Sequence, residues 1–143
     1  MLTQDEVRDL FTRRFHCSQI VFREWAEELG IDEAEAARIA APLGGGMFRG
    51  DTCGAVGGAM LVIGARYGAC EANDKENDLR MQAKVKEFLD QFTERFGDTY
   101  CRKLLGYDFS QPGEYLKAAR AGVMLKQCPD YVTGALEILE DIM

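Results

Sequence analysis

The pattern of apolar and polar positions along the chain has the three- to four-residue period of amphipathic helices. Its clearest stretch is residues 78–96, which Gly97 ends. The apolar face of that stretch comprises Val85, Phe88, Leu89, Phe92 and Phe96. No segment shows the two-residue alternation of a half-buried strand. The pattern therefore predicts an all-α protein.

Capping and stop signals mark the other helices. The capping box Thr3-Gln-Asp-Glu6 starts a first helix that runs to about residue 14. A helix over residues 114–125 and a last helix opened by Cys128-Pro129 close the chain, since proline is favoured at the first helical position. Together these signals predict a single domain, residues 1–143, as a helical bundle of about six to seven helices around a glycine-rich central helix.

The glycine-rich helix follows a loop with three consecutive glycines, in the segment of residues 43–58. These glycines remove the steric penalty on positive φ and allow a tight turn. Asp51 or Thr52 is expected to cap the helix, which places Cys53 in its first turn. Glycines recur every fourth residue at Gly50, Gly54 and Gly58. If they share a face of the helix, another backbone or a second sulfur can approach that face closely.

Composition and charge narrow the classes of partner. The 143-residue chain has a net charge of −7 and a pI of about 4.8, which argues against nucleic acid and against an anionic membrane surface as partners. Its longest uncharged run, residues 52–65, is too short for insertion into a membrane. The first residues do not resemble a signal peptide, so we expect a cytoplasmic protein whose thiols stay mainly reduced.

Four of the five cysteines are predicted to lie at or near helix starts, namely Cys17, Cys53, Cys101 and Cys128. The dipole and the free N–H groups of a helix N-terminus lower the pKa of a thiol below its free value of about 8.5. If the four helix starts face one another, thiolates gather at one site, as a dithiol/disulfide couple or a metal site requires. Cys70 lies in a polar loop and is expected to be a bystander, and the only histidine, His16, is expected on the surface.

The cysteines and their neighbours also match a known family pattern. Residues 53–58, Cys-Gly-Ala-Val-Gly-Gly, resemble the central Cys-Gly-Ala-x-x-Gly motif of the C_GCAxxG_C_C family. The family name records one cysteine before this motif and two after it, which Cys17, Cys101 and Cys128 match in order. The resemblance covers essentially the whole chain. It implies a redox-active protein that works through these cysteines, with no settled substrate or reaction.

Three functions remain open on the sequence alone. The leading hypothesis is a thiol redox protein, in enzyme terms a thiol-dependent oxidoreductase, in which two of the four cysteines form a reversible disulfide and Cys53 is the most nucleophilic. The first alternative is a zinc or iron–sulfur module with Cys17, Cys53, Cys101 and Cys128 as ligands. The second is a non-catalytic helical domain that binds a protein partner. The cofactor, the redox partner and a homodimer are left open.

Overall fold

The computed structural model describes residues 1–143 and contains eight α-helices. They are α1 (Gln4–Thr12), α2 (Cys17–Leu29), α3 (Glu33–Ala40), α4 (Gly54–Tyr67), α5 (Lys75–Phe96), α6 (Cys101–Leu105), α7 (Glu114–Ala121) and α8 (Val123–Ile142). Two short helical turns, η1 (Ala41–Leu43) and η2 (Gly46–Gly50), connect α3 to α4. The predicted all-α class is confirmed, since the only β-type pairing is an isolated bridge between Thr52 and Tyr100.

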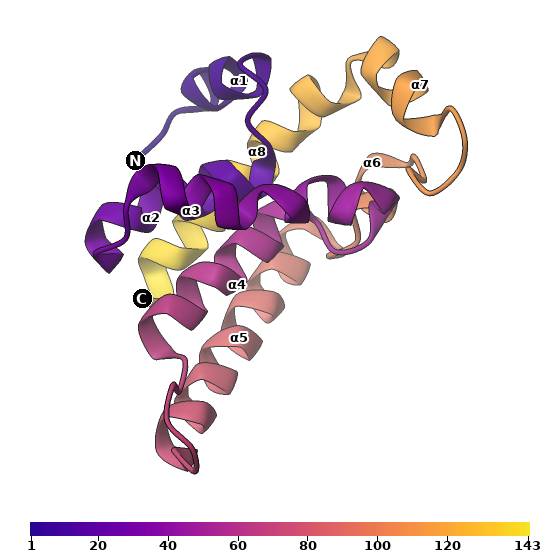
Figure 1. Ribbon diagram of the computed structural model, residues 1–143. Helices are drawn as coiled ribbons and strands as arrows, with labels where there is room; N and C mark the ends of the chain where they lie inside the picture. The colour runs from indigo at the N-terminus through magenta and orange to yellow at the C-terminus, as the bar shows by residue number, and fades with distance from the viewer.

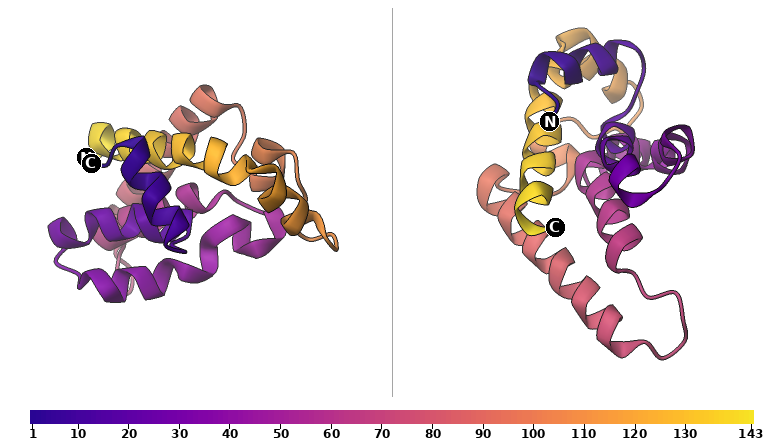
Figure 2. Two further views of the ribbon diagram at one scale, coloured as in Figure 1. Left: turned by 90° about the horizontal axis from the view of Figure 1, so that it is seen from above. Right: turned by 90° about the vertical axis from the view of Figure 1, so that its left-hand side faces the viewer.

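Helix α4 occupies the centre of the bundle. It packs against α2, α5 and α8, and α3 packs on α2. Figure 1 shows α4 and α5 side by side down to the loop that joins them, with α2 and α3 crossing near the upper end of α4. The left view of Figure 2 places α6, α7 and the first turns of α8 together at one end of the molecule. The glycine-rich helix is therefore central, as the sequence predicts.

The main hydrophobic core lies between α2, α4, α5 and α8. Its largest fully buried side chains include Phe88 and Phe92 of α5, Ile20 of α2, Ile63 of α4, and Leu136 and Leu139 of α8. A smaller cluster, at the end formed by α6 and α7, consists of Cys101, Leu105, Phe109, Ala118 and Val123. None of the helices combines the length and the apolarity that crossing a membrane requires.

Side-chain caps set the starts of α1, α3 and α5, through Thr3, Asp32 and Asp74. The predicted capping box forms at α1, where the Glu6 N–H donates to Thr3 Oγ1 at 3.2 Å and the Thr3 N–H donates to Glu6 Oε1 at 3.1 Å. Helix α5 begins at Lys75 rather than at residue 78, because the Asp74 side chain accepts a hydrogen bond from the Asn77 N–H at 3.2 Å. The cap adds residues to the helix that carries the main phenylalanine stripe.

The start of α8 corrects the prediction for the last helix. The helix begins at Val123 and not at Cys128-Pro129, and Gly122, with a φ of 70°, separates it from α7. Pro129 therefore lies inside α8, where it has no N–H to donate to the carbonyl of Leu125. That carbonyl accepts a hydrogen bond from the Arg8 side chain of α1 at 3.3 Å instead. This contact from a distant helix offsets part of the cost of an interior proline.

Candidate functional site

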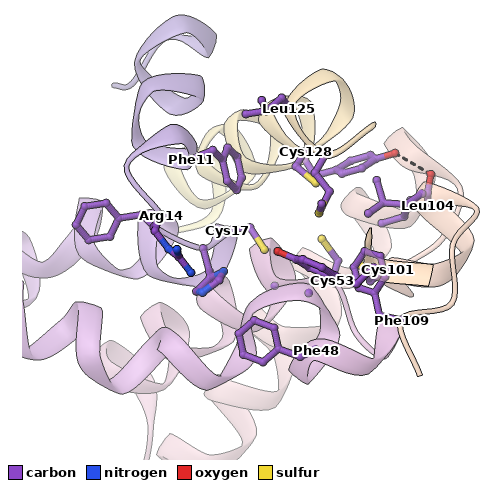
Figure 3. Close-up of a pocket in the computed structure, with 18 of the residues that line it drawn as sticks. Phe11, Arg14, Cys17, Phe48, Cys53, Cys101, Leu104, Phe109, Leu125 and Cys128 are labelled. Carbon is purple, nitrogen blue, oxygen red and sulfur yellow. Dashed lines mark hydrogen bonds between the residues drawn. The ribbon is translucent and has the colours of Figure 1, made fainter. Parts of the chain in front are cut away.

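Cys17, Cys53, Cys101 and Cys128 line one apolar cavity of about 320 Å³. They come from α2, from the residue before α4, from α6 and from α8, which are far apart along the chain. Figure 3 shows the four side chains around the cavity. Of the 19 residues that line it, 14 are hydrophobic, so the thiols lie in surroundings of low polarity. The fifth cysteine, Cys70, is exposed and lies outside the cavity.

Cys17 and Cys53 lie at the starts of two closely packed helices. Cys17 is the first residue of α2, and Cys53 directly precedes α4. Gly54 faces the Cys17 sulfur, and a β-carbon at this position would overlap that sulfur. The Cys17 thiol therefore fills the space that the absent side chain of Gly54 leaves, one residue from Cys53. The glycine face admits a second sulfur, as predicted, although Gly50 precedes the helix and is not part of that face.

A left-handed turn carries the chain to these two cysteines. Gly45, Gly46, Met47 and Phe48 have φ values of 57°, 62°, 56° and 59°. Glycine adopts this conformation freely, whereas a residue with a side chain pays about 1–2 kcal/mol for it. The turn places Phe48 at the cavity, where its ring lies edge-on to that of His16 with 4.9 Å between the centroids. Strain of this kind is retained mainly at functional sites.

A short backbone pairing holds Cys53 beside Cys101. The Cys53 N–H donates to the Thr99 carbonyl and the Cys101 N–H donates to the Asp51 carbonyl, both at 2.7 Å. These bonds flank the isolated bridge, whose residues come one position before each cysteine. The pairing therefore brings the backbone of the segment before α4 next to that of the segment before α6, and with it Cys53 next to Cys101.

Neither residue predicted to cap the glycine-rich helix does so. Thr52 forms the bridge with Tyr100, and the Asp51 carboxylate pairs with the guanidinium of Arg102 at 3.1 Å. Both residues thus contact the segment around the start of α6 and do not cap α4. Cys53 itself is the residue that precedes α4. The two interactions connect the segments that carry Cys53 and Cys101.

The predicted placement at helix starts is right for three cysteines and wrong for the fourth. The three at a helix start, or directly before it, are Cys17, Cys53 and Cys101. Cys128 lies inside α8, because that helix begins at Val123 rather than at the proline. It reaches the cavity on the same helical face as Met124 and Tyr131, which precede and follow it by about one turn.

Burial raises the pKa of the thiols, whereas their positions at helix starts were expected to lower it. It raises the pKa of Cys17, Cys53, Cys101 and Cys128 above the ordinary thiol value, and that of Cys101 to about 12. The prediction of depressed pKa values is therefore wrong, because desolvation of a thiolate outweighs the favourable backbone groups. All four thiols are protonated at neutral pH in this reduced form.

Backbone N–H groups offset part of this burial at two of the thiols. Four of them, including those of Gly45 and Gly54, favour the Cys17 thiolate. The N–H groups of the first turn of α4 do the same for Cys53, although the thiol makes no capping hydrogen bond. A charge on one thiol raises the pKa of its neighbours, and the strongest such effect on Cys53 comes from Cys17. The group therefore loses its protons one at a time.

Three further residues line the cavity without having been predicted. The surface position expected for His16 is wrong, since the ring is half-buried against Phe48, and burial together with the nearby Arg14 lowers its pKa. Arg14 is the only charged residue of the lining. The Tyr131 hydroxyl donates to the Leu104 carbonyl at 3.2 Å. The sequence signal for these positions is weak, because contacts between segments distant in the chain bring them together.

The cysteine side chains surround the cavity without converging on one centre. All five cysteines are free, and no three Cys, His, Asp or Glu side chains lie close enough together to hold a metal ion. The cavity opens to solvent past Phe48, Tyr115 and Leu125, which are 45%, 47% and 43% exposed. The arrangement offers buried thiols to a small molecule that enters from this rim.

Comparison with known proteins gives a family and no individual relative. No curated protein and no solved structure matches the chain. Residues 15–142 match the family described as "Putative redox-active protein (C_GCAxxG_C_C)". The matched range covers most of the chain and contains all four cysteines of the cavity. The protein is therefore a member of the C_GCAxxG_C_C family, as its cysteine pattern predicts.

Proposed function

We propose that the protein carries out reversible thiol–disulfide chemistry, with Cys17 and Cys53 as the reacting pair. The observation that carries this proposal is the position of the Cys17 sulfur, which lies against Gly54, one residue from Cys53, in a cavity open to solvent. The description of the family as redox-active agrees with such chemistry. The assignment of two particular cysteines rests on this packing, since the family pattern treats all four alike.

The proposed reaction proceeds in two exchange steps with a partner disulfide as oxidant. The Cys17 thiol loses its proton to solvent and its thiolate attacks one partner sulfur. The partner S–S bond breaks, and the first partner thiolate leaves and takes up a proton from solvent. The Cys53 thiol then loses its proton to solvent and attacks the Cys17 sulfur, which releases the second partner thiolate. The protein loses two electrons and two protons, and the partner gains them as two thiols.

Cys17 replaces Cys53 as the proposed first nucleophile. More backbone N–H groups face the Cys17 sulfur than the sequence indicates, because the left-handed turn brings that of Gly45 to it. Cys101 adjoins Cys53 through the backbone pairing, and Cys128 faces the pair from α8. We assign Cys101 to a later exchange, in which it attacks the Cys53 sulfur and one S–S bond forms as another breaks.

Two other functions compete for the same cysteines. A zinc or iron–sulfur module needs three or four of the sulfurs around one point, and no three metal-binding side chains lie together in this way. Such a site would require the cavity walls to move inward. A non-catalytic domain would use the cysteines as core filling, whereas these cysteines line a cavity that opens to solvent.

Thiol counting combined with metal analysis tests the proposed function. Protein purified without oxygen is assayed for iron and zinc, and its thiols are counted before and after a mild oxidant. We expect no stoichiometric metal and the loss of two thiols, which a reductant restores. The matched control is Cys70→Ser, which removes an exposed cysteine outside the cavity and is expected to leave this loss unchanged.

Two results contradict the proposal. Stoichiometric metal that protects the four cavity thiols would establish the metal-binding alternative. A thiol count that oxidation leaves unchanged in the metal-free protein would establish that the cysteines have a structural role.

A further inference from the structure

The charge of the cavity differs from that of the protein as a whole. The chain has 24 acidic and 17 basic residues, yet the lining of the cavity contains no carboxylate and one arginine, Arg14. The Arg14 guanidinium takes part in none of the ion pairs or side-chain hydrogen bonds of the molecule, whereas its neighbour Arg13 pairs with Asp9 at 3.7 Å. Figure 3 shows Arg14 at the edge of the cavity, on the side of Cys17. An unpaired cation thus borders an apolar cavity.

The backbone at Arg14 gives a second, independent observation. Arg14 has a φ of 71° and occupies the left-handed position that ends α1. Its N–H donates to the Phe11 carbonyl at 3.0 Å, and the Phe15 N–H donates to the Leu10 carbonyl at 3.1 Å, the hydrogen-bond pattern that usually has glycine at this position. Capping alone therefore favours glycine here. The chain instead keeps an arginine, and the conformation that strains its backbone also sets its side chain beside the cavity.

The other residues that line the cavity indicate what kind of ligand fits it. Aromatic rings predominate around the thiols, contributed by Phe11, Phe15, Phe48, Phe109, Tyr115 and Tyr131. A volume of about 320 Å³ suits a small molecule with a planar apolar body rather than a polypeptide. The thiols of Cys17 and Cys53 lie deep in the cavity, since they are only 8% and 5% exposed. The cavity therefore has apolar walls, the thiols of Cys17 and Cys53 deep inside it, and a single cation, Arg14, at its edge.

From these features, and resting on the proposed thiol–disulfide function, we infer that the oxidant is a small organic disulfide with an apolar body and an anionic group that Arg14 binds. The guanidinium holds the anion at the edge while the apolar body carries the S–S bond to the thiols. The Cys17 thiol loses its proton to solvent and its thiolate attacks the nearer sulfur. The S–S bond breaks, and the thiolate that leaves keeps the anionic group and takes up a proton from solvent. Cys53 then displaces the second half, so two protein thiols become one disulfide and the substrate becomes two thiols.

Two aromatic disulfide reagents, one anionic and one uncharged, test this inference. Dithiobis(nitrobenzoic acid) is an aromatic disulfide with carboxylates, and dithiodipyridine is an uncharged one. Both are reacted with the 143-residue protein carrying Cys70→Ser, so that the exposed thiol does not contribute. The ratio of the two rate constants is compared in the parent, in Arg14→Gln and in Arg13→Gln. We expect Arg14→Gln to lower the anionic-to-neutral ratio about tenfold, the loss of one hydrogen-bonded charge, and Arg13→Gln to leave it within about twofold.

The outcomes separate the two proposals. If the cavity thiols react with neither reagent, the proposed function fails. If they react with both and Arg14→Gln leaves the ratio unchanged, only the inference about the anionic substrate fails. Arg14→Lys keeps the charge and is expected to recover part of the ratio. Salt gives a check that needs no variant, since screening is expected to lower the ratio in the parent protein and to leave the rate with dithiodipyridine unchanged.

Discussion

The two walls of the cysteine cavity are built by different kinds of packing. In the wall formed by the starts of α2 and α4, backbone lies against backbone, and Gly54 leaves room for the Cys17 sulfur. In the wall formed by α6 and α8, side chains such as Leu105 and Met124 surround Cys101 and Cys128. Close backbone packing gives the first wall N–H groups that favour a thiolate, and the causes that shift the pKa of Cys101 and Cys128 include none.

This difference suits the separate roles that we propose for the two walls. Cys17, Cys53 and Cys101 are buried and Cys128 is half-buried, and burial raises the pKa of all four thiols, so burial alone does not distinguish them. Four backbone N–H groups favour the Cys17 thiolate, whereas burial raises the pKa of Cys53 above that of Cys101. We therefore expect exchange to begin at Cys17. In the proposed reaction the α2–α4 wall holds Cys17 and its partner Cys53, and the α6–α8 wall holds thiols that react later. Each prediction below tests this division of the cavity.

The largest expected difference is between two single variants, each of which lacks one cysteine of a different wall. Cys17→Ser abolishes the reversible loss of two thiols on mild oxidation, because no attacking sulfur remains beside Cys53. Cys128→Ser preserves that loss, because the pair on the other wall is intact. Thiol counting of both variants, each reduced and then oxidised, measures the difference. Equal loss of the reaction in both variants would show that the walls act as one unit.

A methyl group at Gly58 is expected to disturb the α2–α4 wall strongly. A β-carbon there would lie 2.7 Å from the Ser18 carbonyl oxygen and 3.0 Å from the Val21 β-carbon. Gly58→Ala therefore lowers the free energy of unfolding by about 1–3 kcal/mol, as overpacking does. Chemical denaturation of the parent and the variant measures this change in the free energy of unfolding.

Gly64→Ala is the matched control in the same helix. Nothing lies within 4 Å of its added β-carbon, so the free energy of unfolding rises by about 0.5–1 kcal/mol from helix propensity alone. The free energy of unfolding is expected to fall in Gly58→Ala and to rise in Gly64→Ala. Equal changes in the two variants would mean that α2 and α4 are not in close backbone contact.

The pH dependence of stability follows from the raised thiol pKa values. An unfolded thiol releases its proton above a pH of about 8.5, whereas the folded protein keeps the Cys101 proton until about 12. The stabilisation is complete below the unfolded pKa and is lost as the pH rises toward the folded one. Each raised thiol contributes about 1.4 kcal/mol per pH unit to this decline.

Denaturation at several alkaline pH values, with and without Cys101→Ala, measures that contribution. The variant is expected to lose stability less steeply between pH of about 8.5 and 12 than the parent does. Identical slopes would mean that Cys101 is not buried in the folded protein.

The smallest expected effect is a gain in stability from Arg14→Gly. Relief of the left-handed strain at φ 71° outweighs the flexibility that glycine adds to the unfolded chain, for a net gain of about 0.5–1 kcal/mol. The same variant is expected to lose the preference for anionic disulfides. A loss of stability would show instead that the arginine side chain is held by packing at the end of α1.

Local pattern predicts much of the fold and part of the site. The phenylalanine stripe of α5 and the capping box at Thr3 depend on residues a few positions apart, so the sequence identifies them. The position of three cysteines at or directly before helix starts is local in the same way, whereas their gathering at one cavity depends on packing between distant helices and stayed a condition in the sequence analysis. The prediction for Cys128 is wrong because Pro129, which is typical of a helix start, lies inside α8, and the carbonyl that it leaves free accepts a hydrogen bond from Arg8 of a distant helix.

Tertiary burial explains the remaining errors. The thiol pKa values depend on how deeply the walls enclose each sulfur, which no local spacing encodes. His16 is half-buried because the left-handed turn brings Phe48 onto its ring. The role inferred for Arg14 depends on its being the only charge on the lining of a cavity, which only the assembled helices define.

Peptide mapping of the mildly oxidised protein tests the central claim most directly. Digestion without reductant, followed by mass spectrometry, identifies which cysteines are joined. We expect a peptide in which Cys17 is linked to Cys53, lighter by two hydrogens than the sum of its two parts and separated again by reductant. A protein that forms no such link, or whose first link joins Cys101 to Cys128, would contradict it.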